Sequence, residues 1–303
     1  MRRKQAAIAG PATLDVVIVN WNGGDDVLRA ARSALNFGAR PIVVDNGSTD
    51  GSADRIELTL PGILVLRMGH NAGFSRACNV GAQAGNGEYV MLLNPDAELI
   101  QGGIADLVRA FERDAQTAIV GPRTVDAQGH QQITVRQFPT LPTLFLYQLK
   151  LHRLARWIRP LRDYFMVDFA GDSPVPVDQV IGAALAMRRR DWEDFGGLDE
   201  GYFLLFEEVD LSRRISARGR TSLYWPYVVV RHLGGTSFRK LSHLRVQRIW
   251  NASLLRYARV HLGIPAAILL ATTIPITLVV GALRDSGALI RGRADRFCSY
   301  VGG

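Results

Sequence analysis

The first 120 residues alternate between short apolar runs and longer segments whose apolar positions have a helical spacing. The short runs are rich in Val, Ile and Leu and end at small or polar residues, which is typical of buried strands. Strands are expected at 16–20, 42–45, 64–68, 89–93 and 118–121. Helices are expected at 25–36, 52–60, 75–84 and 103–114. This alternation predicts an α/β fold in which a mostly parallel sheet carries helices on both faces.

The pattern is less regular after residue 125. Asp126–Gly129 is typical of a turn, and Gln131–Arg136 of a returning edge strand. A helix is expected at Leu144–Ile158, within a segment rich in proline, aromatic residues and arginine. Further on, the pattern predicts strands at 182–188, 222–225 and 228–232 and a helix at 208–217.

The segment after Ser242 begins with a predicted amphipathic helix. One side carries Arg245, Arg248, Arg256 and Arg259, and the other carries Val246, Trp250, Leu254 and Tyr257. A solvated charged face is the default explanation, and a basic helix on an anionic membrane is the alternative.

Residues 262–283 then run without a charge, which is long enough to cross a bilayer. Pro265 and Pro275 would kink a helix here. Arginines flank both ends, so the positive-inside rule gives no orientation. This favours a shallow or hairpin insertion over a clean span, and a buried docking helix is the competing interpretation.

Composition and charge limit the classes of binding partner that are expected. The chain has 303 residues, 48% of them hydrophobic, and a formal net charge of +8. A basic excess favours acidic partners, but no nucleic-acid motif is present, so nucleotide diphosphates and a membrane surface are expected instead of nucleic acid. The two cysteines, Cys78 and Cys298, have no metal-ligand or disulfide-framework spacing and fit a reducing cytoplasm.

The most informative motif follows the second predicted strand, where Ile42-Val43-Val44 leads to Asp45 and then to Asn-Gly-Ser-Thr-Asp-Gly. Such a strand delivers its acid to the carboxyl edge of the sheet, where open α/β folds bind ligands. A carboxylate there can accept hydrogen bonds from a pyrimidine ring N–H or from ribose hydroxyls.

Together with later motifs, this stretch resembles the family 2 glycosyltransferases, in particular their bacterial rhamnosyltransferase-like branch. The matching segments are 17–22, 44–51, 71–74, 93–97, 196–200, 207–211 and His232 with Gly234, Gly235 and Ser237. The resemblance implies a GT-A fold with a Rossmann-like, mostly parallel sheet. The resemblance covers the catalytic domain expected at 14–240, and the sequence pattern predicts a disordered tail at 1–13 before it and a C-terminal helical, membrane-associating segment at 241–303 after it.

The resemblance also implies a divalent cation, Mg²⁺ or Mn²⁺. Asn94-Pro95-Asp96 stands where the family carries its metal-binding Asp-X-Asp, with Asn in the first place. Asp96 keeps the negative charge at the metal, and Asn94 can hydrogen-bond ribose or diphosphate. His232 resembles the late histidine that completes metal or diphosphate binding.

Glu207-Glu208-Val209-Asp210 resembles the family's acidic motif, whose second acid is the general base. By this resemblance Glu208 is the catalytic base, with Glu207 beside it at the substrate. Glu207 or Asp210 could also cap the predicted helix.

The nucleotide pocket is expected to include Asn20, Asn22, Asp45 and Asn71. Many relatives carry an arginine for the diphosphate where this chain has Cys78, and Arg76 is a candidate substitute.

The sequence therefore predicts an inverting glycosyltransferase. The expected donor is a nucleotide-diphosphate sugar, dTDP-rhamnose first and a UDP-sugar next. A polyprenyl-linked or glycan acceptor at the cytoplasmic face of the bacterial inner membrane is expected, in cell-envelope polysaccharide synthesis. Two alternatives stay open: a sugar nucleotidyltransferase, and a catalytically inactive membrane scaffold with the same fold.

Overall fold

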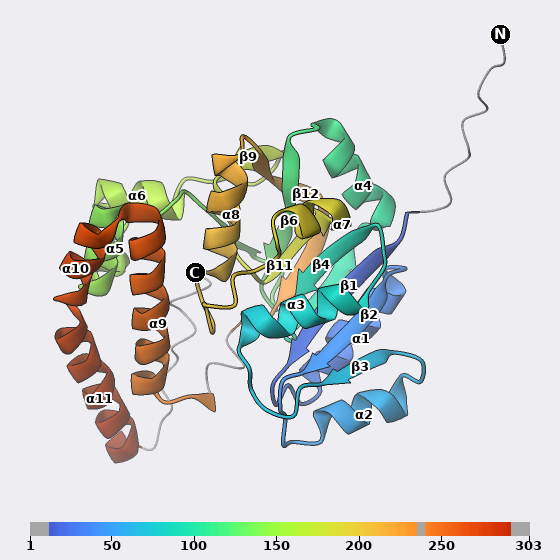
Figure 1. Cartoon of the computed structure of the whole chain (residues 1–303), viewed down its shortest axis with the longest axis horizontal. Coiled ribbons are helices and arrows are strands. Elements are labelled where there is room, and N and C mark those ends of the chain that lie inside the picture. Colours follow the sequence, from blue (N-terminus) through green and yellow to red (C-terminus); the bar gives the residue numbers. More distant parts are fainter. Residues whose placement is uncertain (1–11, 235–239, 292–303) are drawn as a thin grey trace, which may run out of the picture.

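A twisted sheet forms the centre of the molecule in the computed structural model, which describes residues 12–234 and 240–291 (Figure 1). Its strands follow the spatial order β3-β2-β1-β4-β11-β6-β12-β5. Their bounds are β1 Leu14–Asn20, β2 Arg40–Asp45, β3 Leu64–Arg67, β4 Tyr89–Leu93, β5 Ala97–Gln101, β6 Thr117–Val125, β11 Ala184–Arg188 and β12 Thr221–His232. Most neighbours are parallel, but β11 runs antiparallel to β4 and β6, and β5 to β12.

Helices cover both faces of the sheet because alternate strand residues point to opposite sides. Val16 and Ile18 of β1 join one core with α1 (Asp26–Asn36), α2 (Ser52–Thr59) and α4 (Ile104–Arg113). Val17 and Val19 join the other with α3 (Phe74–Ala84), α7 (Arg189–Asp194) and α8 (Glu207–Ala217). The predicted α/β fold with a mostly parallel sheet is confirmed.

β6 ends at Val125, four residues beyond the predicted end at 121, and the elements up to α4 follow the sequence prediction to within about two residues at their ends, with one exception. The exception is β5, which the hydrophobic pattern missed. Its segment Ala97-Glu98-Leu99-Ile100-Gln101 is short and directly follows β4, and it is held as a strand by antiparallel pairing with β12. That pairing joins segments 130 residues apart, so no local pattern could reveal it.

Three later predictions are corrected by the structure. The edge strand at 131–136 is two short strands: β7 (Gln131–Gln132) pairs with β6, and β8 (Val135–Arg136) pairs with β10 (Gln179–Val180). The strands at 222–225 and 228–232 are one strand, β12, with an irregular register between Trp225 and Val229.

The predicted helix 144–158 is broken instead of continuous. α5 spans Leu141–Gln148, because Lys150 adopts a left-handed backbone with φ 61° that a helix cannot continue. A 3-10 turn, η1, follows at Leu151–Leu154, and α6 spans Arg159–Phe165. The β9 strand (Val175–Val177) then returns the chain to the edge of β12.

The C-terminal helices stand at one end of the molecule (Figure 1). They are α9 (His243–Tyr257), a π-helical turn η3 (Ala258–Leu262), α10 (Ile264–Ala271) and α11 (Ile274–Arg291). Leu254 and Tyr257 of α9 and Leu270 of α10 form a third core with Tyr202 and Phe206 of the loop before α8. The packing therefore runs without a break across the predicted boundary at 240.

The uncharged segment 262–283 forms two helices with a bend of 41° between them. Pro265 lies at the start of α10 and Pro275 at the start of α11, where a proline is tolerated. No single helix within the described ranges has the length and apolar character to cross a bilayer, whereas the bent pair has both. The predicted tail at 1–13 lies outside the described residues except for residues 12 and 13.

Candidate active site

A cleft of about 250 Å³ opens at the carboxyl ends of β1 and β4, where an open α/β sheet binds ligands. Six of the residues singled out from the sequence line it, and they come from four separate stretches of the chain. They are Asn71, Asn94, Asp96, Glu207, Glu208 and His232. The loops after strands and the start of a helix thus converge on one cleft, as the motif order predicted.

Asp96 and His232 come together because β5 and β12 pair. His232, the last residue of β12, is the register partner of Ala97, so its ring reaches the carboxylate that precedes β5. The Nε2 atom of His232 lies 3.3 Å from Oδ1 of Asp96. The pairing that the sequence pattern missed is therefore the contact that builds this site.

A divalent cation fits this pair only if the substrate supplies further ligands to it. The described ranges contain no group of three or more His, Cys, Asp or Glu side chains arranged to hold a metal. Hard cations such as Mg²⁺ are commonly bound by one or two carboxylates together with substrate phosphates and water. Asp96 supplies such a carboxylate and His232 an imidazole, a common metal ligand, so the donor set fits a metal completed by a diphosphate.

Glu207 and Glu208 enter the cleft at the start of α8. The two residues before the helix, Leu205 and Phe206, have φ of 72° and 70°, a left-handed conformation that costs energy for bulky side chains. This strained turn points the first residues of α8 at the cleft. Oε2 of both glutamates is buried and accepts no hydrogen bond from the described residues. Both oxygens are therefore available to a ligand.

Burial raises the pKa of both carboxyl groups. For Glu207 the neighbouring charge of Glu208 adds to burial, and the pKa lies well above its ordinary value. For Glu208 burial also raises the pKa, but backbone N–H groups at the helix start and of Gly182 oppose the rise. A carboxyl group whose pKa is raised by burial holds a proton more readily than a solvated glutamate, which suits a general base.

Gly182 and Ala183 connect the base to the metal-site loop. The Gly182 N–H donates to the Glu208 carboxylate, and the backbone N–H of Asn94 donates to Ala183 O at 2.9 Å. The backbone before β11 thus lies between the two functional groups, and all four residues line the cleft.

Three predicted pocket residues, Asn20, Asn22 and Asp45, lie beside the cleft and bond across the loops after β1 and β2. Asn20, fully buried, donates from Nδ2 to Asp45 Oδ1 at 3.0 Å and to Ser52 Oγ at 2.8 Å. Asn22 Oδ1 accepts the backbone N–H of Thr49 at 2.7 Å. These bonds fix the loops after β1 and β2, and direct contact of Asn20, Asn22 and Asp45 with a ligand stays a prediction.

Asn71 is placed by Asn46, which sequence reasoning did not select. Gly47, with φ 78°, brings the loop so near His70 that a Cβ would lie 2.7 Å from the His70 carbonyl carbon. Asn46 then donates to Asn71 Oδ1 at 3.1 Å and accepts from the Ala72 N–H at 2.8 Å. Asn46 lines the cleft beside Asn71.

Trp21, from the matching segment 17–22, also lines the cleft, and so do Gln132 and Arg245, which sequence reasoning did not select. Arg245 is exposed like Arg248 and Arg259 on the predicted charged side of α9, but it lines the cleft and the other two do not. Arg76 does not line the cleft and lies 4.0 Å from Glu200. Arg245 is thus the arginine that the described lining offers to a diphosphate. Of the residues that follow His232 in its motif, Gly234 lines the cleft, whereas Gly235 and Ser237 lie outside the described residues.

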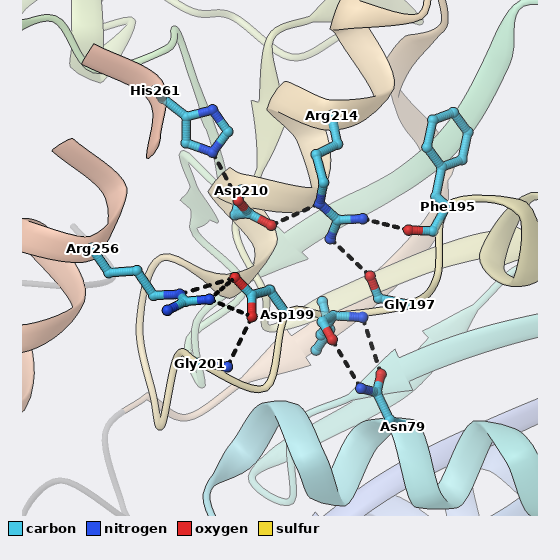
Figure 2. A network of polar contacts seen from close by, with 10 residues as sticks. Asn79, Phe195, Gly197, Asp199, Gly201, Asp210, Arg214, Arg256 and His261 are labelled. Carbon is cyan, nitrogen blue, oxygen red and sulfur yellow. Dashed lines mark hydrogen bonds and ion pairs between the residues drawn. The ribbon is translucent and has the colours of Figure 1, made fainter. Parts of the chain in front are cut away.

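A polar network behind the cleft ties α8 to the C-terminal helices (Figure 2). Asp210 does not cap α8; it accepts from Arg214 Nε at 2.8 Å and lies 2.7 Å from His261 Nε2. Asp199 is held in a bidentate pair by Arg256, with N–O distances of 2.6 to 2.9 Å. The side-chain amide of Asn79 donates to the backbone carbonyl of Leu198 and accepts from the backbone N–H of Leu198. The loop before the strained turn is therefore anchored on three helices.

Replacing Arg256 by Gln is expected to loosen this loop. The bidentate pair is about one-third exposed, so we expect a loss of only about 1 kcal/mol in the free energy of unfolding. Turnover should fall by roughly tenfold, since this loop leads into the turn that positions Glu208 at the start of α8. Urea unfolding and kcat would be measured for the single variants Arg256→Gln and Asp199→Asn and for the double variant. Additive losses would show that the two side chains act independently.

The comparison with known proteins agrees with this geometry. The family model for glycosyl transferase family 2 matches residues 15–171. The chain belongs to glycosyltransferase family 2. Two Mycobacterium tuberculosis N-acetylglucosaminyl-diphospho-decaprenol L-rhamnosyltransferases, from strains CDC 1551 and H37Rv, are each 30% identical over 236 residues. These matches cover 72% of this chain and 75% of each relative. The hexosyltransferase Agl10 of Haloferax volcanii is 28% identical over 66% of this chain and 61% of its own length.

Solved structures show the same fold at lower sequence identity. The mannosyltransferase PcManGT from Pyrobaculum calidifontis, in complex with GDP-Man and Mn²⁺, has a TM-score of 0.52 at 15% identity and covers 96% of this chain and 80% of its own. GalNAc-T7 with UDP, GalNAc and Mn²⁺ has a TM-score of 0.53 at 19% identity, covering 73% of this chain and 44% of its own. The predicted GT-A fold and the predicted glycosyltransferase family are both confirmed.

Proposed function

We propose that this family 2 glycosyltransferase inverts the anomeric centre and transfers rhamnose from dTDP-rhamnose to a polyprenyl-linked glycan. A UDP-sugar is the second candidate donor, and a free glycan the second acceptor. The observation that carries the proposal is the convergence of Glu208 with the Asp96–His232 pair on one cleft. The mycobacterial relatives, named as rhamnosyltransferases that act on a decaprenol-linked sugar, support rhamnose and a lipid-linked acceptor.

In the proposed reaction Glu208 accepts the proton of the acceptor hydroxyl as its oxygen attacks the anomeric carbon. The bond from that carbon to the diphosphate oxygen breaks on the opposite side, and the nucleotide diphosphate leaves with the electron pair. Because entry and departure occur on opposite faces, the configuration inverts. The unpartnered Oε2 of Glu208 provides the acceptor atom for the proton.

The leaving diphosphate needs positive charge around it. A divalent cation bound by Asp96 and His232 would stabilise the charge that develops on the leaving oxygen. Arg245, from α9, adds a fixed positive charge to the same cleft, and Asn94 adds an amide that can donate to a ribose or phosphate oxygen. Trp21 and Asn71 offer an aromatic face and an amide to the nucleoside.

We place the enzyme at the cytoplasmic face of the bacterial inner membrane, in cell-envelope polysaccharide synthesis. A polyprenyl-linked acceptor is confined to a membrane, so its enzyme must work at the membrane surface. Apolar side chains of Leu204, Leu205, Leu241 and Ile249 line the cleft beside the polar groups and suit an acceptor that leads to a lipid.

A donor panel tests the proposal. Full-length enzyme would be assayed with Mg²⁺ or Mn²⁺ for nucleotide diphosphate release from dTDP-rhamnose, UDP-galactose, UDP-N-acetylglucosamine and GDP-mannose, with and without polyprenyl-lipid extract. We expect metal-dependent release from dTDP-rhamnose that the lipid extract stimulates. Release from another donor would replace rhamnose. If no donor gave nucleotide diphosphate release and no nucleotide diphosphate gave a thermal shift, the inactive scaffold would be favoured.

The sugar nucleotidyltransferase alternative predicts pyrophosphate release from a nucleoside triphosphate and a sugar phosphate. It needs a basic, glycine-rich loop after the first strand to hold the triphosphate. The loop after β1 instead carries Asp25 and Asp26, and family membership argues for sugar transfer.

A further inference from the structure

The α10–α11 pair presents large apolar side chains to the outside, unlike helices of a water-exposed surface. Its outward residues are large and apolar: Ile264, Ile268, Ile276, Val279 and Leu283 are each 58–66% exposed. They recur at helical spacing, so α11 presents Ile276, Val279 and Leu283 along one side. Contiguous exposed apolar surface of this kind marks an interaction site.

The inward side of α11, together with Thr273 just before it, is polar. Thr273 and Thr277 are buried, and they accept hydrogen bonds from Gln148 of α5 at 3.3 Å and from Asn251 of α9 at 3.1 Å. Gly281 continues this side, and a Cβ there would lie 3.3 Å from Leu244 Cα, so the two helices approach closely. The hydrogen-bonding groups of the pair are thus satisfied by the protein, and its hydrocarbon faces outward.

The far end of the described part of α11 is also fixed to α9. Asp285 accepts the backbone N–H of His243 at 2.8 Å and of Leu244 at 3.0 Å, at the positive end of the α9 dipole. Burial raises the pKa of Asp285, but these backbone bonds outweigh it and lower the pKa. α11 is therefore bound to α9 from Thr277 to Asp285, which Figure 1 shows as two helices side by side.

Positive charge gathers beside the apolar side. Lys150 lies between α5 and η1 and donates to Gln247 Oε1 at 2.8 Å. Burial, together with the positive charges of Lys150, Arg153 and Arg284, lowers the pKa of His152 to about 4. All three cations therefore act on His152, and Arg153 among them is exposed at the surface. A basic group next to exposed hydrocarbon is complementary to anionic lipid headgroups above acyl chains.

We infer that α10 and α11 dock on the surface of an anionic lipid bilayer, lying in the interface and not crossing it. A crossing helix would have to leave its contacts with α9 and α5 or draw their polar groups into hydrocarbon, and either is costly. The inference rests on the proposed function, since a polyprenyl-linked acceptor requires an enzyme at a membrane. α9 lies between the docked pair and the cleft, with Arg245 and Ile249 facing the cleft and Asn251 facing α11.

Vesicle flotation tests the docking. Full-length protein would be mixed with phosphatidylcholine vesicles, with or without about one-third phosphatidylglycerol. Protein is expected to float with the anionic vesicles and to be released as NaCl rises from about 0.05 to about 0.5 M. The double variant Ile268→Asp/Ile276→Asp should bind at least about tenfold more weakly. The matched control Leu35→Asp/Leu58→Asp changes exposed leucines of α1 and α2 and should bind like the wild type.

Several results would overturn the inference. They are a wild type that stays with the soluble fraction, an α10–α11 variant that floats like the control, and a wild-type dimer that this variant converts to a monomer. A tag at the C-terminus should stay open to protease added outside the vesicles; protection would mean crossing. Nucleotide diphosphate binding, measured by thermal shift, should be equal in both variants. Flotation without turnover of any donor would leave the docking standing and remove the proposed function.

Discussion

Replacement of Glu208 by Gln is expected to lower kcat by about 10²- to 10⁴-fold, with little change in the KM for the donor. The amide fills the same space but cannot accept the proton of the attacking hydroxyl. Glu208 lines the cleft with a buried carboxyl oxygen that has no hydrogen-bond partner among the described residues, so that oxygen is not committed to another protein group there. Steady-state kinetics of nucleotide diphosphate release, at saturating metal, would measure the effect.

The pH dependence gives a second readout for Glu208. Since burial raises its pKa above the ordinary value, the base ionises at a higher pH than a solvated glutamate. kcat should therefore rise with pH through that pKa, and Glu208→Gln should lose this ascending limb. The control Glu57→Gln changes an exposed acid of α2 and should keep both the rate and the limb. An unchanged limb in Glu208→Gln would assign the base to another group.

As pH rises through the pKa of Glu208, the free energy of unfolding should fall while kcat rises. A folded-state pKa raised above the unfolded value means that the folded protein binds the proton more tightly, so the free energy of unfolding falls as pH rises through this interval. Glu208→Gln removes a buried ionisable group and should unfold at an equal or higher temperature than the wild type at neutral pH. Lost activity with retained stability separates a catalytic role from a damaged fold.

Replacement of Asp96 by Asn is expected to lower kcat/KM by about 10²- to 10³-fold at a fixed metal concentration. The carboxylate is the anionic member of the Asp96–His232 pair, and the amide would leave a divalent cation with a neutral protein site. The metal concentration at half-maximal rate should rise accordingly. Titration of Mn²⁺ and Mg²⁺ into chelator-treated enzyme would measure both quantities.

The control for this variant is Asp54→Asn, an exposed acid of α2 paired with Arg67. Its metal titration should match the wild type. If Asp96→Asn lost activity with an unchanged metal midpoint, the carboxylate would act on the substrate directly. If the wild type kept full activity after chelation, metal dependence itself would be wrong.

The sequence located most of the functional chemistry because strand-ending motifs are local signals. Asn94-Pro95-Asp96 and Glu207-Glu208 stand where an apolar run stops or a helix begins, and such positions reach the edge of a sheet. Arg245 shows the limit of this approach. Its helical spacing groups it with Arg248 and Arg259, but only the packing of α9 against the loop before α8 turns it toward the cleft.

By itself, the sequence determined the α/β fold, the family resemblance and the identity of the acids and the histidine, because periodicity and motif order are properties of the chain. The tertiary structure decided what depends on contacts between distant segments. The β5–β12 pairing brings His232 to Asp96, and the strained turn at Leu205 and Phe206 directs Glu208 into the cleft. Residues 262–283 likewise read as one apolar stretch, and only packing on α9 separates a polar inner side from an exposed apolar one.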